Sequence, residues 1–315
     1  MFLFSDDFLP EVCFGLDSAS IKICLKLNPV SRTAEVLRRL SLWKPSADSP
    51  GRLRMSMRQM DLKTELERIS AFIRDYLQRY GFNRVILGLS GGIDSSLSAA
   101  VAVHALGKDN VLGVMLPYKN SSPESYEDAL LVAEALQIRH EIIEITPMVD
   151  AYFDHCQADA SALRRGNWMA RIRMCVLYDL SSRDRALVMG TSNRTELLVG
   201  YFTQYGDGAC AFEPIGGLYK TEVRAMAKLL AIPQRIIDKV PTADLWAGQT
   251  DEGELGLSYA ELDEILWLLT EEHLSPQEIE AKGFQSAKIS RVQHLMQVSE
   301  FKRNLPPVPG EESYV

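Results

Sequence analysis

Residues 88–96 read Gly-Leu-Ser-Gly-Gly-Ile-Asp-Ser-Ser, and this stretch decides the fold. It follows residues 84–89, an apolar run typical of a buried strand, and precedes residues 95–106, whose Ala, Val and Leu content predicts a helix packed on a sheet. A helix that starts directly after a strand presents backbone N–H groups and a partial positive charge. Because Gly91 and Gly92 let the backbone bend around an anion, the stretch predicts a phosphate or pyrophosphate site.

The other side chains of this stretch refine the prediction. Ser90, Ser95 and Ser96 add hydroxyl donors, whereas Asp94 would repel a phosphate unless Mg²⁺ bridges the two. The stretch lacks the Gly-Lys-Ser/Thr ending of a Walker A loop and the GxGxxG of a dinucleotide fold. An ordinary glycine-rich strand–turn–helix corner is the bland alternative, but the full Ser-Gly-Gly-Xaa-Asp-Ser string is much more specific than such a corner.

Strand-like runs alternate with helical patterns along the chain. Helices are predicted over 62–80, 123–136 and 168–182, and further strands over 111–116, 138–145 and 187–190. This alternation predicts an α/β fold, a doubly wound, Rossmann-like parallel sheet flanked by helices. After Gly217 the chain is predicted to be mostly helical, with helices over 220–230, 234–239, 258–270, 276–282 and 286–299.

Composition excludes several classes of protein. The 315 residues hold 34 Lys and Arg against 42 Asp and Glu, a net charge of −8, which argues against a non-specific nucleic-acid or membrane-surface binder. No run approaches the roughly 18 apolar residues of a membrane helix. The five cysteines form no CxxC pair, so we expect neither a disulfide scaffold nor a zinc ribbon, and a cytoplasmic location.

The first part of the chain differs from the rest. Residues 1–54 carry eight basic and six acidic side chains, and a Pro/Ser/Gly cluster at 45–51 resembles a linker. We expect 1–54 to be an accessory or poorly ordered extension, 55–310 the catalytic domain and 311–315 a tail. The alternative is that the natural start lies at Met55, Met57 or Met60. Deletion of residues 1–54 is expected to leave activity intact.

The Ser90–Ser95 string resembles the PP-loop of the ATP pyrophosphatases, of the adenine nucleotide alpha hydrolase type, which split ATP into AMP and pyrophosphate while adenylating a substrate. Five further segments follow in a characteristic order and spacing: Asn-Trp-Met-Ala-Arg-Ile-Arg-Met at 167–174, Gly-Thr-Ser-Asn-Arg-Thr-Glu at 190–196, Tyr-Gly-Asp-Gly at 205–208, Pro-Ile-Gly-Gly-Leu-Tyr-Lys-Thr at 214–221 and Pro-Thr-Ala-Asp-Leu at 241–245. Over about 58–309 the chain resembles the ammonia-dependent NAD synthetases.

The resemblance implies a two-step reaction with ATP, deamido-NAD and ammonia as substrates. The nicotinate carboxylate of deamido-NAD attacks the α-phosphorus of ATP, which gives an adenylate and pyrophosphate. Ammonia then attacks the activated acyl carbon, which gives NAD and AMP. A homodimer with dinucleotide sites near the subunit interface is implied as well, and the helix at 61–80 is a candidate partner surface.

The resemblance also implies roles for particular residues. Asp94 and Lys220 would be catalytic, and Asp94 and Glu196 would hold Mg²⁺. ATP would be bound by Gly88, Leu89, Ser90, Gly91, Gly92, Ile93, Asp94, Ser95, Thr191, Lys220 and Thr242. Deamido-NAD would be bound by Arg171, Gln204, Asp207 and Lys302. Each of these is more often a cap, a first-turn acid, a solvated lysine or a polar helix face when met alone, so the prediction rests on the joint match.

Three positions depart from the pattern. The family commonly has Lys at the place of Gln204, Asp at the place of Ala211 and His at the place of Phe301. A neutral Gln loses a charge-assisted hydrogen bond of about 1–2 kcal/mol. All three lie on the dinucleotide side, which predicts normal ATP binding and weaker binding of deamido-NAD.

Other functions stay open at this point. Another PP-loop amidotransferase and a non-catalytic nucleotide-binding homologue are the alternatives, whereas a tRNA-thiolating enzyme would usually carry catalytic cysteines. A glutamine-dependent synthetase would need a glutaminase domain of more than about 200 residues, so we expect ammonia from solution or from a separate partner. The loops 118–124 and 244–256 have the composition of mobile lids. The five histidines show no ligand spacing and are expected to be structural.

Overall fold

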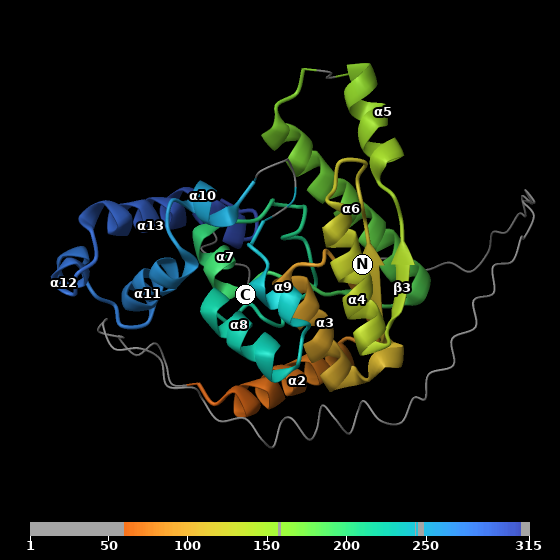
Figure 1. Cartoon of the computed structure of the whole chain (residues 1–315), viewed down its shortest axis with the longest axis horizontal. Helices are drawn as coiled ribbons and strands as arrows, with labels where there is room; N and C mark the ends of the chain where they lie inside the picture. The colour runs from red at the N-terminus through yellow and green to blue at the C-terminus, as the bar shows by residue number, and fades with distance from the viewer. Residues whose placement is uncertain (1–59, 157–158, 243, 245–248, 310–315) are drawn as a thin grey trace, which may run out of the picture. The chain divides into compact units, whose positions relative to one another are not determined.

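A parallel sheet lies at the centre of the fold (Figure 1). The computed structural model describes residues 60–156, 159–242, 244 and 249–309. Within them the strands β1 (Val85–Gly88), β2 (Val111–Met115), β3 (Arg139–Ile142) and β4 (Leu187–Val188) pair in the order β3-β2-β1-β4, with every pairing parallel. The chain winds outward from β1 in both directions, so the predicted doubly wound sheet is confirmed.

The strands distribute their side chains alternately to two cores. Val85 and Leu87 of β1 pack into one hydrophobic cluster, and Ile86 packs into the other. The same alternation continues in β2, where Val111 and Met115 join the first cluster and Leu112 and Val114 the second. This period of two, on strands that are apolar throughout, is what a sheet covered on both faces requires.

Helices cover both faces of the sheet. On the first face lie α2 (Leu62–Arg79), α3 (Ile93–Leu106), α4 (Pro123–Leu136), α8 (Lys220–Leu229) and α9 (Gln234–Asp238). The second face is covered by α5 (Thr146–Cys156) and α6 (Ala162–Asp184). The apolar stripe of α2, which includes Ile69 and Ile73, is buried in the first core, so it serves this chain's own packing.

The part after Gly217 is mostly helical, as predicted. After α8 and α9 come α10 (Asp251–Leu255), α11 (Tyr259–Thr270), α12 (Pro276–Ala281) and α13 (Ser286–Val298), and α11 to α13 lie together in Figure 1. Helices α10, α11 and α13 share a third hydrophobic cluster with α7 (Arg194–Val199), a short helix after β4, whereas Ile279 of α12 belongs to a fourth cluster. The start of α12 is a capping box between Ser275 and Glu278, which the sequence had indicated.

Several boundaries differ from the predictions. The third strand ends at Ile142 instead of 145, and β4 ends at Val188 instead of 190, although the N–H groups of Ile143 and Met189 still donate to carbonyls of the neighbouring strands. The short helices α5, α7 and α10 were not predicted, and α6 begins six residues before position 168. Residues 1–54 and 311–315 lie outside the described residues, so the proposed domain boundaries stay predictions. In the described part of the chain, no helix has the length and apolarity needed to cross a bilayer.

Candidate active site

The loop between β1 and α3 is a tight turn held by its own serines. The hydroxyls of Ser90 and Ser95 lie 3.0 Å apart, and Ser95 also donates to the carbonyl of Gly92 over 3.1 Å. Gly91 has a φ of +77°, and a Cβ there would stand 2.2 Å from the carbonyl oxygen of Ser125 on α4. Only glycine therefore allows α4 to pack this closely on the loop.

A cavity of about 630 Å³ opens at this loop. Its walls include every predicted loop residue except Gly91: Gly88, Leu89, Ser90, Gly92, Ile93, Asp94 and Ser95. Gly92 is the N-cap of α3 and supplies no side-chain hydrogen bond to the first turn, which leaves those N–H groups to a ligand. The volume is within the usual range for small-molecule sites.

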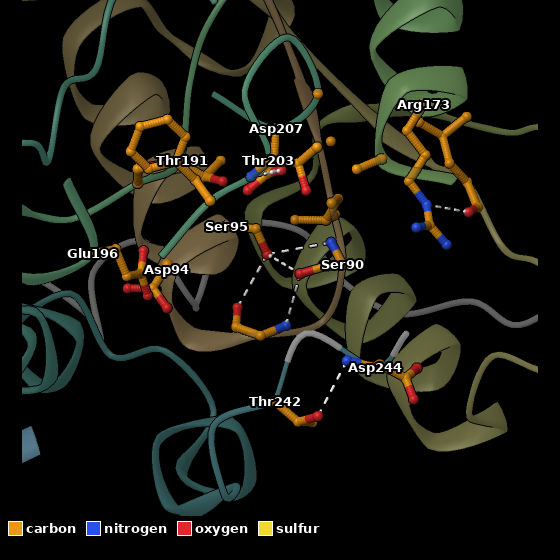
Figure 2. Close-up of a pocket in the computed structure, with 18 of the residues that line it drawn as sticks. Ser90, Asp94, Ser95, Arg173, Thr191, Glu196, Thr203, Asp207, Thr242 and Asp244 are labelled. Atoms are coloured by element: carbon orange, nitrogen blue, oxygen red, sulfur yellow. Dashed lines mark hydrogen bonds between the residues drawn. The ribbon is translucent and has the colours of Figure 1, made fainter. Parts of the chain in front are cut away.

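The segment after β4 brings a second set of residues to the same edge of the sheet. Thr191 and Glu196 line the cavity, as predicted. Asn193, which is fully buried, caps α7 by accepting the N–H of Glu196 over 3.0 Å, and its amide donates to Asp94 Oδ1 over 2.8 Å. Because β1 and β4 are parallel neighbours, their carboxyl ends place Asp94 beside Glu196, and Figure 2 shows the two side chains together.

Lys220, at the start of α8, joins these two carboxylates. Its side chain is only 2% exposed, and its Nζ lies 2.5 Å from Asp94 Oδ2 and 3.0 Å from Glu196 Oε1. Burial by itself would lower the pKa of Lys220, but the attraction of the two carboxylates outweighs burial and raises it. Burial raises the pKa of Glu196 to about 8, against the attraction of Lys220.

Two further residues fix the position of Lys220. Its backbone N–H donates to the hydroxyl of Thr195 over 3.0 Å, and that hydroxyl donates to the buried Asp263 of α11. The ammonium group lies 4.8 Å from the centre of the Tyr259 ring, a cation–π contact. The lysine is therefore held from α7 and α11 and has little freedom to move.

The pair of carboxylates fits a divalent cation that is shared with a substrate. In the described residues, no group of three or more His, Cys, Asp or Glu side chains could hold a metal by itself. Mg²⁺, however, is usually bound in nucleotide sites by one or two carboxylates, with phosphate oxygens and water completing its octahedron. Asp94 and Glu196, both within reach of one Lys220 ammonium group, match that donor set.

Thr242 lines the cavity on the side of α4. Its hydroxyl accepts the N–H of Asp244 over 3.1 Å, and Asp244 Oδ2 accepts the N–H of Ser122 at the start of α4 over 3.0 Å. Figure 2 shows Thr242 and Asp244 apart from Asp94 and Glu196. Part of the predicted lid 244–256 is the helix α10, and residues 245–248 lie outside the described residues.

The residues predicted to bind deamido-NAD divide into two pairs. Asp207 and Lys302 line the cavity, and Lys302 Nζ donates to the carbonyls of Gly200 and Phe202 over 2.7 and 2.9 Å. Arg171 and Gln204 do not line it, and the guanidinium of Arg171 instead donates to the main-chain carbonyl of Gln204 over 3.3 Å.

Ala211 and Phe301 also lie outside the cavity lining. Ala211 packs against the first core, and its carbonyl accepts the hydroxyl of Tyr76 over 2.8 Å. The side chain of Phe301 is 60% exposed. None of the three positions that depart from the family pattern, Gln204, Ala211 and Phe301, therefore lines the cavity.

Several cavity residues were not predicted from the sequence. Arg173 lines the cavity and is anchored by a 2.9 Å hydrogen bond from its Nε to the carbonyl of Leu116. Residues two apart on a helix point in different directions, so Arg171 and Arg173 could not both face the cavity, and periodicity alone could not choose between them. Asn193 had a usable signal, because Asn193 and Glu196 have the spacing of a capping box.

Cysteine and histidine take no part in the reactive geometry. Among the residues that the structure describes, none lining the cavity is a histidine. Cys210 lines it, but its thiol donates to Glu213 Oε1 over 3.3 Å, and burial raises the pKa of that thiol far above its ordinary value. A thiol with a raised pKa is a poor nucleophile, so Cys210 is assigned a packing role.

The fold and the loop together define a class. The architecture is that of an ATP pyrophosphatase with a PP-loop. It combines a parallel sheet of strand order 3-2-1-4, a Ser-Gly-Gly-Ile-Asp-Ser turn after β1 and a buried lysine between two carboxylates.

Comparison with known proteins gives the family. The family model described as NAD synthase matches residues 65–306, and the chain belongs to this family. An NH(3)-dependent NAD(+) synthetase of Fusobacterium nucleatum is 48% identical over 252 residues, which cover 80% of this chain and 97% of the relative. The resemblance inferred from the motifs is confirmed.

Solved structures agree with this assignment. An NMN synthetase of Francisella tularensis superposes with a TM-score of 0.72 at 33% identity, over 80% of this chain and all of the other. An NH3-dependent NAD synthetase of Campylobacter jejuni, in complex with nitrate, superposes with a TM-score of 0.68 at 36% identity, over 79% of this chain and 99% of the other.

Proposed function

We propose that this chain is a ligase that forms NAD, AMP and pyrophosphate from deamido-NAD, ATP and ammonia through an adenylated deamido-NAD. The observation that carries the proposal is the cluster of Asp94, Glu196 and Lys220 beside the loop 88–95, in one cavity at the carboxyl edge of the sheet. The family and the high identity to NH(3)-dependent NAD(+) synthetases support the choice of substrates.

In the first step, a carboxylate oxygen of the nicotinate bonds to the α-phosphorus of ATP, and the bond to the α,β-bridging oxygen breaks. The electron pair stays on pyrophosphate, whose growing charge needs fixed donors. The N–H groups at the start of α3, the hydroxyls of Ser90 and Ser95 and the ammonium of Lys220 are proposed to supply them. Mg²⁺ on Asp94 and Glu196 would neutralise further phosphate charge.

In the second step, the lone pair of ammonia bonds to the acyl carbon, the nitrogen releases one proton to water, and AMP leaves with the electron pair of the acyl–oxygen bond. Asp207 and Lys302 are proposed to contact the dinucleotide directly. Arg171 is proposed to act with Gln204, because its side chain holds the main-chain carbonyl of that residue. Thr191 and Thr242 are proposed ATP contacts, since both line the cavity.

Finer features belong to the same proposal. We propose a homodimer, which is supported by two exposed aromatic residues, Phe72 on α2 and Tyr80 at the C-cap of α2, 42% and 55% exposed. We also propose 55–310 as the catalytic domain and a cytoplasmic location, where ATP and ammonium ions are available.

The similarity to an NMN synthetase supports a second candidate substrate, nicotinate mononucleotide, which would be amidated by the same chemistry. The test is incubation of the chain with ATP, Mg²⁺ and NH₄⁺ plus one of the two acids, with NAD or nicotinamide mononucleotide separated by chromatography. A kcat/KM at least tenfold higher for deamido-NAD is expected. A preference for the mononucleotide would replace the proposed substrate, and ATP binding without either product would favour a nucleotide-binding homologue.

The lysine at the centre of the site supplies the control for that assay. Lys220→Met should lower kcat/KM for product formation by about 10²–10³-fold, whereas Lys228→Met, on the exposed face of the same helix α8, should leave it unchanged. Equal rates in the two variants would contradict the assignment of this cluster as the reaction centre.

A further inference from the structure

Lys239 is a cation of the cavity that no motif indicates. It follows α9 and lines the cavity on the side of α4. Its Nζ lies 2.9 Å from Asp128 Oδ2 and 3.2 Å from the hydroxyl of Ser125, both on α4. Its side chain remains 21% exposed.

Asp128 has a second basic partner. The guanidinium of Arg235, on α9, also donates to this carboxylate, whose side chain is only 6% exposed. One carboxylate thus faces two cations, so the group carries an excess positive charge. Arg235 does not line the cavity and its side chain is 52% exposed, so the excess charge that faces the cavity is that of Lys239.

The same face of α4 is packed against the loop. A Cβ on Gly91 would meet the carbonyl oxygen of Ser125 at 2.2 Å and the Cβ of Asp128 at 2.9 Å. Both residues that hold the Lys239 ammonium group therefore also touch the glycine turn, as does the backbone nitrogen of Ala129. This places a positive charge directly beside the loop.

We propose that Lys239 is a second phosphate-binding cation, which binds the β- and γ-phosphates of ATP and then the departing pyrophosphate, while Arg235 neutralises Asp128. This inference rests on the proposed function, in which the bond between the α-phosphorus and the bridging oxygen breaks with its electron pair on pyrophosphate. The charge that develops there is stabilised by an ammonium group already in place, because Ser125 and Asp128 fix its position.

The test compares Lys239→Met with Arg235→Met. Each variant removes one of the two cations of Asp128, but only the first removes charge from the cavity. Inorganic pyrophosphate with Mg²⁺ is titrated calorimetrically into the full-length chain, and the KM for ATP is measured with saturating deamido-NAD and NH₄⁺. Lys239→Met should weaken pyrophosphate binding and raise the KM for ATP about tenfold, the value of a lost charged hydrogen bond. Arg235→Met should weaken pyrophosphate binding less than Lys239→Met does, because it removes the cation that neutralises Asp128 but leaves the Lys239 ammonium group in the cavity.

Two results would overturn the proposal. If Lys239→Met bound pyrophosphate as strongly as the wild type, the proposed role of Lys239 would be refuted. Equal losses of pyrophosphate affinity in Lys239→Met and Arg235→Met would mean that both residues act by holding α4 through Asp128. Lys239→Arg, which keeps the charge, should recover most of the affinity. Thermal unfolding is followed in parallel, and if Lys239→Met does not fold, Lys239→Gln provides the same comparison with the hydrogen bonds kept and the charge removed.

The binding measurement also separates this inference from the proposed function. It needs neither deamido-NAD nor ammonia, so a wild-type chain that forms no NAD would refute the proposed reaction. The loss of pyrophosphate affinity in Lys239→Met would still decide the role of Lys239.

Discussion

Two ion clusters flank the glycine loop, and their compositions are inverted. On one side a single cation, Lys220, lies between the carboxylates of Asp94 and Glu196. On the other side a single carboxylate, Asp128, lies between Lys239 and Arg235. The first cluster offers two carboxyl groups to a metal ion, and the second has an excess of positive charge and suits phosphate.

The clusters also differ in burial. Lys220 is 2% exposed and is held by hydrogen bonds from α7 and α11, whereas Lys239 is 21% exposed and is held by α4 alone. A charge that is enclosed and fixed interacts more strongly than one in contact with solvent, because the surrounding medium screens it less. We therefore expect substitutions in the first cluster to affect catalysis most, and substitutions in the second cluster to affect phosphate affinity and packing.

The largest effect is expected from breaking the first cluster. Lys220→Met should lower kcat/KM for amidation by about 10²–10³-fold, the usual loss when a fixed group that stabilises developing charge is removed. NAD formation measures the effect. A loss no greater than that of Lys239→Met would show that burial does not rank the two clusters.

Disruption of the second cluster should lower the stability of the fold more than the rate of the reaction. Asp128→Asn removes the carboxylate that joins α4 to α9 and leaves its two cations with a neutral partner. The free energy of unfolding in urea should fall by about 1–3 kcal/mol, as expected when a mostly buried charged hydrogen bond is broken. A change of less than about 0.5 kcal/mol would mean that the two cations are already solvated.

Stability without ligands should depend on pH through the first cluster. A carboxyl whose pKa is raised in the folded state stabilises the fold while it is protonated, and that contribution is lost as the pH rises from about 4.5 to about 8, where Glu196 titrates. The contribution of Glu196 to the slope should be about 1.4 kcal/mol per pH unit at most. Glu196→Gln should flatten it.

Glu213 provides the matched control for this pH dependence. Burial raises its pKa to about 7, so it contributes with the same sign, but it belongs to neither cluster. Glu213→Gln should remove the contribution of Glu213 to the pH dependence of stability and leave the contribution of Glu196 unchanged. An unfolding profile of the Glu196→Gln variant that is parallel to the wild type would contradict the raised pKa of Glu196.

A change outside both clusters should have the smallest effect. Gln204→Lys restores the residue common in the family, yet the structure keeps Gln204 off the cavity wall and uses its main-chain carbonyl to hold Arg171. The KM for deamido-NAD should change by less than about threefold, less than a full charge-assisted contact would give. A larger decrease would mean that position 204 reaches the substrate when the dinucleotide binds.

The amount of the fold that could be predicted follows the strength of each local pattern. The helix at 62–79 and the strands at 85–88 and 111–115 were predicted closely, because long periodic or fully apolar runs depend little on context. The edge strand β3 was predicted over too long a range, and the helices α5, α7 and α10 were not predicted, since elements with a weak periodic pattern are decided by their neighbours. The capping box at Asn193 and Glu196 was the one local sign of α7.

The loop at 88–95, the family and the residue types of the first cluster could all be inferred from the sequence alone. The loop could be inferred because a phosphate-binding turn is a local structure that its own glycines and serines impose. Only the tertiary structure decided which distant side chains complete the site. Three features depend on how helices far apart in sequence pack. They are the choice of Arg173 over Arg171, the link from Asp263 to Lys220 and the sharing of Asp128 by Lys239 and Arg235. Burial and charge balance are properties of that packing, so no local pattern could have revealed the second cluster.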